Sequence, residues 1–162
     1  MKDINEMKDS RHRPVILSAN YDQVDGQQAG QQEVEQLSLG LQTGRMDGRA
    51  DIVAQLWRDA TAQKEGLLSE WPIHRILDAS ILICRSLDYF QEAYRQEQLY
   101  DPEHPVFDRI PLQGAALSVG ICTDNSGIDG DIQDFQRALE ENGYLIGERL
   151  RILARLLEEM GY

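Results

Sequence analysis

Residues 37–57, LSLGLQTGRMDGRADIVAQLW, decide how the N-terminal half of this chain folds. Apolar residues recur at every second position in two runs, Leu37, Leu39 and Leu41, then Ile52, Ala54 and Leu56. This spacing is the period-two pattern of half-buried β-strands, and the residues between the runs are rich in turn formers. The stretch therefore predicts an antiparallel pair of strands. A helix over residues 50–60 is the alternative.

Two further segments outside this pair also predict strands. Residues 14–17 are a short apolar run, and residues 115–122 alternate apolar with small side chains. Before the first strand, residues 1–13 mix basic and acidic side chains around no apolar centre, so we expect a flexible N-terminal tail and not a secretory signal.

Three segments show the spacing of amphipathic helices. The longest opens at Ser69 or Trp71, with Pro72 in its first turn, where a missing N–H costs nothing. It keeps one apolar face for six turns, through Ile73, Ile76, Leu77, Ile83, Cys84, Leu87, Phe90 and Tyr94. A second helix follows Asp129 or Asp131, which can cap it, and ends before Asn142.

A last helix, from about Tyr144, carries apolar residues in heptad-like spacing at Ile146, Leu150, Leu153, Leu157 and Met160. Leu145, Ile152 and Leu156 widen this apolar face. We therefore expect the helix to be buried on two sides or to meet a second subunit.

These elements follow the order βββαβαα. They predict an α+β fold, a two-layer sandwich in which three main helices pack on a small, mostly antiparallel sheet of about four strands. The length predicts a single domain over residues 14–162.

Charge and composition limit the function. With 16 basic and 28 acidic residues the net charge is −12, a field that repels phosphate backbones, so we expect no nucleic-acid partner. The sequence has no apolar run of membrane-spanning length, so we expect no membrane partner. Cys84 and Cys122 each lie in an apolar stretch, which predicts two buried free thiols and a cytoplasmic protein.

Three polar segments contain candidate site residues. The segment 20–26 offers Tyr21, Asp22 and Asp25 after a strand, although these residue types also form turns. His74, Arg75 and Asp78 lie within two turns of the long helix, where a His–Asp pair can exchange a proton, although a surface or capping role is the commoner one.

The third segment contains Asp124 and Asn125. Residues 124–131 resemble a calcium loop in composition but lack the glycine and glutamate positions of an EF-hand, so a helix-capping loop is favoured over a cation site. The sequence also lacks phosphate-loop, nucleophile-elbow, zinc and dinucleotide motifs, and we predict no metal and no cofactor.

The segment Asn20-Tyr21-Asp22 with Asp25-Gly26 and the helix motif His74-Arg75-Ile76-Leu77-Asp78 resemble a family of small bacterial proteins of unknown function. The similarity runs through most of the chain from Pro14. It implies a single domain, and it supplies no catalytic residue.

Two functional hypotheses follow. The preferred one is an acidic interaction protein that neutralises a basic protein partner, as an immunity or inhibitor protein does, or that self-associates as a homodimer through Leu153, Leu156 and Leu157. The alternative is a small enzyme or ligand-binding domain whose pocket combines the three polar segments.

Overall fold

The computed structural model describes residues 12–18, 20–30, 33–43, 46–59, 66–93 and 98–162. The chain forms two compact units, Met1–Ser80 and Ile81–Tyr162, and the boundary falls inside helix α1 (Ile73–Ala93). Most of the predicted N-terminal tail lies outside the described residues, and the single domain stays a prediction.

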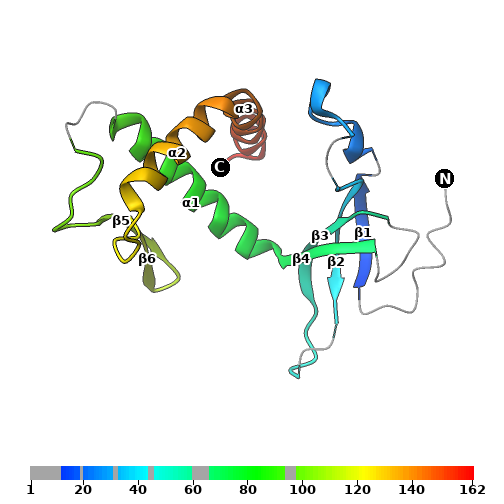
Figure 1. Cartoon of the computed structure of the whole chain (residues 1–162). Coiled ribbons are helices and arrows are strands. Elements are labelled where there is room, and N and C mark those ends of the chain that lie inside the picture. The colour runs from blue at the N-terminus through cyan, green and yellow to red at the C-terminus, as the bar shows by residue number, and fades with distance from the viewer. Residues whose placement is uncertain (1–11, 19, 31–32, 44–45, 60–65, 94–97) are drawn as a thin grey trace. The chain divides into compact units, whose positions relative to one another are not determined.

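The first unit contains an antiparallel sheet whose four strands follow their order in the sequence, β1-β2-β3-β4 (Figure 1). The strands are β1 (His12–Ser18), β2 (Gln36–Gln42), β3 (Asp51–Trp57) and β4 (Leu67–Pro72). The first three confirm the predicted strands, and the alternative helix over residues 50–60 is wrong.

β4 was not predicted, because the sequence reading began the long helix within it, at Ser69 or Trp71. This strand is short, ends in a proline and lies at the edge of the sheet, where a missing N–H is tolerated.

The alternation in β2 and β3 is confirmed, but the face with the lower exposure is not the leucine face. Leu39 is 41% exposed and Ile52 is 52% exposed. The opposite face contains the buried residues Ser38, Val53, Gln55 and Trp57. Both faces of β3 carry large apolar side chains. The alternation of residues along β3 therefore does not show which face of the sheet is buried.

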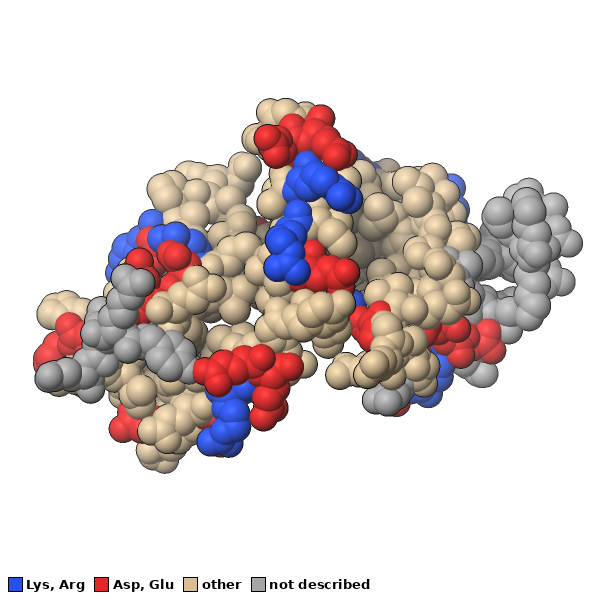
Figure 2. Space-filling model, turned by 90° about the horizontal axis from the view of Figure 1, so that it is seen from above, with Lys and Arg blue, Asp and Glu red and all other residues tan. Residues whose placement is uncertain are grey.

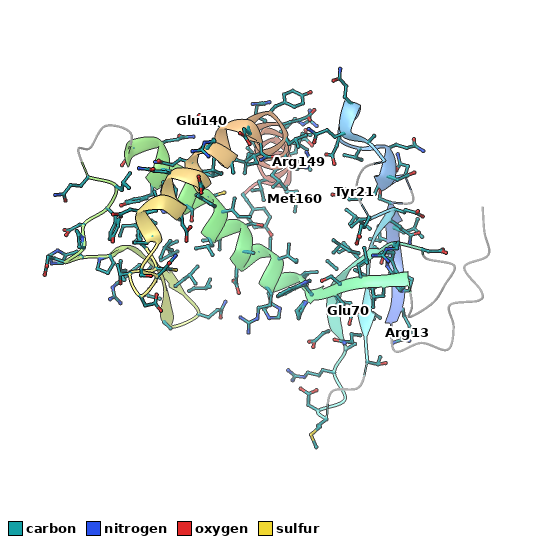
Figure 3. The ribbon with its side chains drawn as sticks, in the orientation of Figure 1. Arg13, Tyr21, Glu70, Glu140, Arg149 and Met160 are labelled. Carbon is teal, nitrogen blue, oxygen red and sulfur yellow. The ribbon has the colours of Figure 1, made fainter. Side chains whose placement is uncertain are left out.

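Hydrogen bonds across three strands satisfy the polar groups on the buried face. The Trp57 indole N–H donates to Ser38 Oγ (2.9 Å), and the Ser38 hydroxyl donates to Gln55 Oε1 (2.8 Å). Gln55 Nε2 then donates to Glu70 Oε2 on β4 (2.7 Å; Figure 3). Ser38, Gln55 and Glu70 are direct cross-strand neighbours, so the three side chains form one row.

The second unit contains a two-stranded antiparallel hairpin of β5 (Val106–Leu112) and β6 (Ala115–Gly120). The predicted fourth strand is therefore β6, which pairs with β5 in a separate sheet. β5 was missed because Asp108, Arg109 and Pro111 interrupt its apolar pattern. The two loop residues, Gln113 and Gly114, have φ values of 50° and 79°, as a two-residue turn of type I′ requires.

The second unit also contains the C-terminal part of α1, α2 (Ile128–Glu141) and α3 (Gly143–Met160). Aromatic rings join α1 to the hairpin and to α2. Tyr89 of α1 stacks on Phe107 of β5 with a centroid distance of 3.9 Å, and Phe90 lies 5.3 Å from Phe135 of α2. Arg85 adds an ion pair to Asp108 of β5, with Nε and Oδ2 2.5 Å apart.

The long helix begins at Ile73, later than predicted, and the burial of its apolar face also differs from the prediction. Phe90 is buried, whereas Ile76, Leu77 and Ile83 are exposed, and Tyr94 lies outside the described residues. Cys84 and Cys122 are free and exposed, so the prediction of buried thiols is wrong. Cys122 lies in the loop that follows β6.

The α+β class is confirmed, with the order ββββαββαα in place of βββαβαα. Short 3-10 helices η2 (Tyr21–Gln23) and η3 (Gly26–Gln28) precede β2. Within the described ranges, none of the helices has the length and apolar character needed to cross a membrane.

We predict that Ser38→Ala lowers the free energy of unfolding by about 1–3 kcal/mol, because it leaves the Trp57 N–H and Gln55 Oε1 buried without their partner. Denaturant midpoints measure the change. Ser126→Ala, at an exposed loop position, is the matched control. Equal midpoints for the two variants would contradict a stabilising role for the buried row.

Candidate functional site

The segment that contains Tyr21, Asp22 and Asp25 forms two successive 3-10 turns in the first unit. Backbone hydrogen bonds from Val24 N to the Tyr21 carbonyl and from Ala29 N to the Gly26 carbonyl, both 3.1 Å, close these turns. Asp25 lies between them with φ at 81°, a conformation that aspartate tolerates better than most residues. Turn formation accounts for the residue types in this segment.

The second candidate group lies in the first turns of α1, also in the first unit. Asp78 is half-buried and accepts a hydrogen bond from Arg75 Nη1 at 3.3 Å, as the i,i+3 spacing of the two residues on a helix allows. His74 is exposed. An exposed imidazole beside an ion-paired carboxylate is a common arrangement on the solvent-exposed surface of a helix.

Asp124 and Asn125 lie in the second unit, in the loop before α2. Asn125 Oδ1 accepts the Gly127 N–H at 2.9 Å, and its Nδ2 donates to Asp131 Oδ2 at 2.6 Å. These bonds support the loop that leads into α2. The N-cap residue of α2 is Gly127, which forms no side-chain cap hydrogen bond, so the predicted capping by Asp129 or Asp131 is wrong. Asp129 and Asp131 lie in the first turn of the helix.

The predicted pocket needs all three segments together. Two of them belong to the first unit and one to the second, so the pocket stays a prediction. Among the residues that the structure describes, no three His, Cys, Asp or Glu side chains are grouped so that they could hold a metal ion.

The C-terminal half of α3 presents a different kind of surface. Its large apolar side chains are 42–68% exposed, and every residue from Arg151 to Tyr162 is exposed. We define the α3 apolar surface as Ile152, Leu153, Leu156, Leu157 and Met160. Met160 lies in its last turn (Figure 3). Spacings of three and four residues place all five side chains on one side of the helix.

The backbone that carries this surface is regular to its end. Gly161 has φ at 87°, its N–H donates to the Glu158 carbonyl, and the Tyr162 N–H donates to the Leu157 carbonyl, both at 3.0 Å. These two bonds form a Schellman motif, which satisfies carbonyl groups that a helix end otherwise leaves unpaired. The apolar side chains are thus displayed on a preformed helix.

The charges next to this surface are balanced. α3 contains three arginines and three glutamates, so its net charge is zero. The neighbouring helix α2 contains five acidic residues and one arginine, a net charge of −4. The net negative charge of the chain therefore comes from residues outside α3.

Sequence reasoning found part of this surface and missed other features. Leu153, Leu156 and Leu157 were predicted as an interface, while Ile152 and Met160 were recognised only as members of the apolar face. The sequence analysis names no partner for His104, whose Nδ1 lies 3.1 Å from Asp101 Oδ2. This hydrogen bond, with that from the Glu103 N–H, lowers the pKa of Asp101. The three-residue spacing of Asp101 and His104 was the feature of the sequence that could have indicated this contact.

Comparison with known proteins gives a family but no activity. Residues 4–162 match the model of DUF6530, described as a family of unknown function. No curated protein and no solved structure gives a significant match to the chain.

We predict that Asn125→Ala lowers the free energy of unfolding by about 1 kcal/mol, since it removes the side chain that bonds Gly127 and Asp131. His74→Ala, at an exposed position, should change it by less than about 0.5 kcal/mol. Thermal melts of the two variants measure both effects. A larger loss for His74→Ala than for Asn125→Ala would show that the imidazole has a structural contact that its exposure conceals.

Proposed function

We propose that this chain, which belongs to the DUF6530 family, is a protein-interaction module and not an enzyme. Its binding site is the α3 apolar surface. The observation that carries the proposal is the exposure of five large apolar side chains within the last three turns of one helix. Single exposed apolar residues are ordinary on protein surfaces, but a contiguous group of them marks an interaction site.

Burial of this surface would provide the driving force for binding. Fully burying a leucine-sized side chain contributes about 1.5–3 kcal/mol, so covering one with about half of its surface exposed contributes about 1 kcal/mol. The five side chains together supply roughly 5 kcal/mol before the entropic cost of association is subtracted. This amount supports a reversible interaction, and additional contacts around the rim would strengthen it.

The charge pattern limits the kind of partner. On the face shown in Figure 2, arginine side chains lie among aspartate and glutamate side chains. With a net charge of −12, the molecule is repelled by nucleic-acid backbones. The balanced charge of α3 favours a protein partner that is recognised by its apolar surface, with little contribution from long-range attraction.

Neutralisation of a basic partner is the other version of this proposal. It would use the net charge of −4 on α2, and charge is its only support. Binding measured at low and high salt concentration distinguishes the two versions. Screening by salt weakens the attraction between exposed charges and leaves the burial of apolar side chains intact. Binding through α3 should be nearly constant between low and high salt, whereas binding through α2 should weaken as salt increases.

We predict that Leu153→Glu combined with Leu157→Glu abolishes protein binding, because two carboxylates would have to lose their hydration at the centre of the interface. Tagged wild type and variant, used in parallel affinity captures with quantitative mass spectrometry, measure the difference. The signal is the set of proteins that the wild type retains and the variant does not.

Leu77→Glu is the matched control, since it makes the same change at an exposed leucine of α1. It should retain every protein that the wild type retains. If the double variant and the control capture the same proteins in the same amounts, the α3 apolar surface is not the binding site and the proposal fails.

A further inference from the structure

We propose that Asn142 and Gly143 form a self-modification site, at which the folded chain converts Asn142 into isoaspartate and aspartate through a cyclic imide. The site lies where α2 meets α3, wholly inside the second unit. Water is the one other reactant. The site shares no residue with the α3 apolar surface, so the test of the proposed function and the test of this site have independent outcomes.

A single residue separates the two helices. α2 ends at Glu141 and α3 begins at Gly143, and Asn142 is both the C-cap of the first helix and the N-cap of the second (Figure 1). Its N–H donates to the Ala138 carbonyl, and its own carbonyl accepts the Ile146 N–H, both at 3.0 Å. The backbone of Asn142 therefore completes the last turn of α2 and starts the first turn of α3.

The nucleophile is the backbone nitrogen of Gly143. An asparagine amide is attacked by the nitrogen of the residue that follows it, and a side chain on that residue hinders the approach. Gly143 has no side chain, and apart from its chain neighbours and the backbone of its own helix no described atom lies within 4 Å of the position that a Cβ would take. Gly143 is also the first residue of α3, and the first four N–H groups of an α-helix have no acceptor within that helix. The nitrogen is therefore unhindered and is not held by the hydrogen bonds of α3.

The electrophile is the Cγ atom of Asn142. The residue is exposed, and among the described residues its side chain makes one hydrogen bond, from Nδ2 to the Ala138 carbonyl at 2.8 Å. This bond directs the amide toward the preceding turn of α2, and Cγ can turn toward the Gly143 nitrogen once the bond breaks. Because the position is exposed, water replaces both partners of the broken bond, and the opening costs little free energy.

Asn125 provides a contrast within the same unit. It is also followed by a small residue, Ser126, but its amide is held at both ends. Its Oδ1 accepts the Gly127 N–H and its Nδ2 donates to Asp131, so two hydrogen bonds must break before its Cγ can reach the next nitrogen. Local chemistry and local structure therefore both favour reaction at Asn142.

The first step forms the imide. The Gly143 nitrogen gives up its proton and attacks Cγ, so that a bond forms between this nitrogen and Cγ. The bond between Cγ and Nδ2 breaks, and Nδ2 leaves as ammonia with the proton that the Gly143 nitrogen lost. A five-membered ring remains, which contains both carbonyl carbons of Asn142. No atom is oxidised or reduced.

Water opens the ring in the second step. Attack of water at Cγ breaks the bond between Cγ and the Gly143 nitrogen and gives aspartate, with the original main chain restored. Attack at the backbone carbonyl carbon breaks the original peptide bond instead. This second route gives isoaspartate, in which the main chain runs through the former side chain and the former backbone carbonyl has become a free carboxylate.

Isoaspartate uncouples the two helices. It inserts one methylene group into the main chain between α2 and α3, and it removes from the main chain the carbonyl that accepts the Ile146 N–H. The bond from Nδ2 to the Ala138 carbonyl is lost as well. Aspartate perturbs the junction less, because it keeps the length of the chain and is a favourable N-cap residue for α3.

The first experiment incubates the full chain at mildly basic pH and follows each asparagine by peptide mass spectrometry, in native buffer and in guanidinium chloride. The ratio of the two rates measures how strongly the fold protects each site. Asn142 should react first in native buffer, and its protection should be roughly three- to tenfold lower than that of Asn125, the equivalent of one hydrogen bond fewer to break. Equal protection of the two sites, or faster native reaction at Asn125, overturns the proposal.

Gly143→Ala tests the nucleophile. The added Cβ enters open space and Gly143 is not among the residues with positive φ, so the variant should keep the fold, which melting curves verify. Reaction at Asn142 should fall to the rate seen at Asn125. Gly130→Ala is the matched control, because it adds the same Cβ in open space within α2 and should leave the rate unchanged. An unchanged rate in Gly143→Ala overturns the attack by this nitrogen.

The products test the route and its consequence. Isoaspartate at position 142 identifies the imide, whereas aspartate alone indicates direct hydrolysis and overturns it. Asn142→Asp reproduces the aspartate product. The isoaspartate form, separated from the aged protein by ion exchange, should melt at a lower temperature than Asn142→Asp. Equal melting temperatures would contradict the uncoupling of α2 from α3.

Discussion

The row of hydrogen bonds from Trp57 through Ser38 and Gln55 to Glu70 is the constraint on which the first unit depends. Gln55 is fully buried, and a buried amide without partners would cost free energy, so β2, β3 and β4 are held in the one register that satisfies it. A slip by one residue would move the whole row to the opposite face of the sheet. Since β4 leads directly into α1 at Ile73, the same register also determines where that helix begins.

The second unit depends on aromatic packing instead. Tyr89 and Phe90 lie at adjacent positions of α1 and contact different neighbours, Phe107 of the hairpin and Phe135 of α2. Burial raises the pKa of the Tyr89 hydroxyl, with the nearby charge of Asp101 adding to the effect. The C-terminal half of α3 lies beyond this cluster, with its apolar side chains exposed. The unit thus combines a packed aromatic centre with an apolar helix that a partner can cover.

Much of the local structure was predictable from the sequence, and the functional site only in part. Three strands of the first sheet, the three helices and the ion pairs of Arg75 with Asp78 and Arg85 with Asp88 follow from spacing alone. β4 and β5 did not follow, because Pro72 and Pro111 resemble helix starts and loop residues when their pairing strands are unknown. Leu153, Leu156 and Leu157 were predicted as an interface from their spacing on α3, and the interface stays a prediction.

The sequence by itself determined the α+β class, the negative charge and the apolar face of the last helix, because each of these is a property of composition or of neighbours within one element. Only the tertiary structure decided which side of the sheet is buried. Ser38 and Gln55 look like surface residues in isolation and become interior residues once their hydrogen-bonding groups satisfy one another across strands. Cys84 and Cys122 show the reverse, since an apolar sequence context does not bury a side chain unless another element covers it. Burial is a relation between segments distant in the chain, so it is settled by their packing and not by the local pattern.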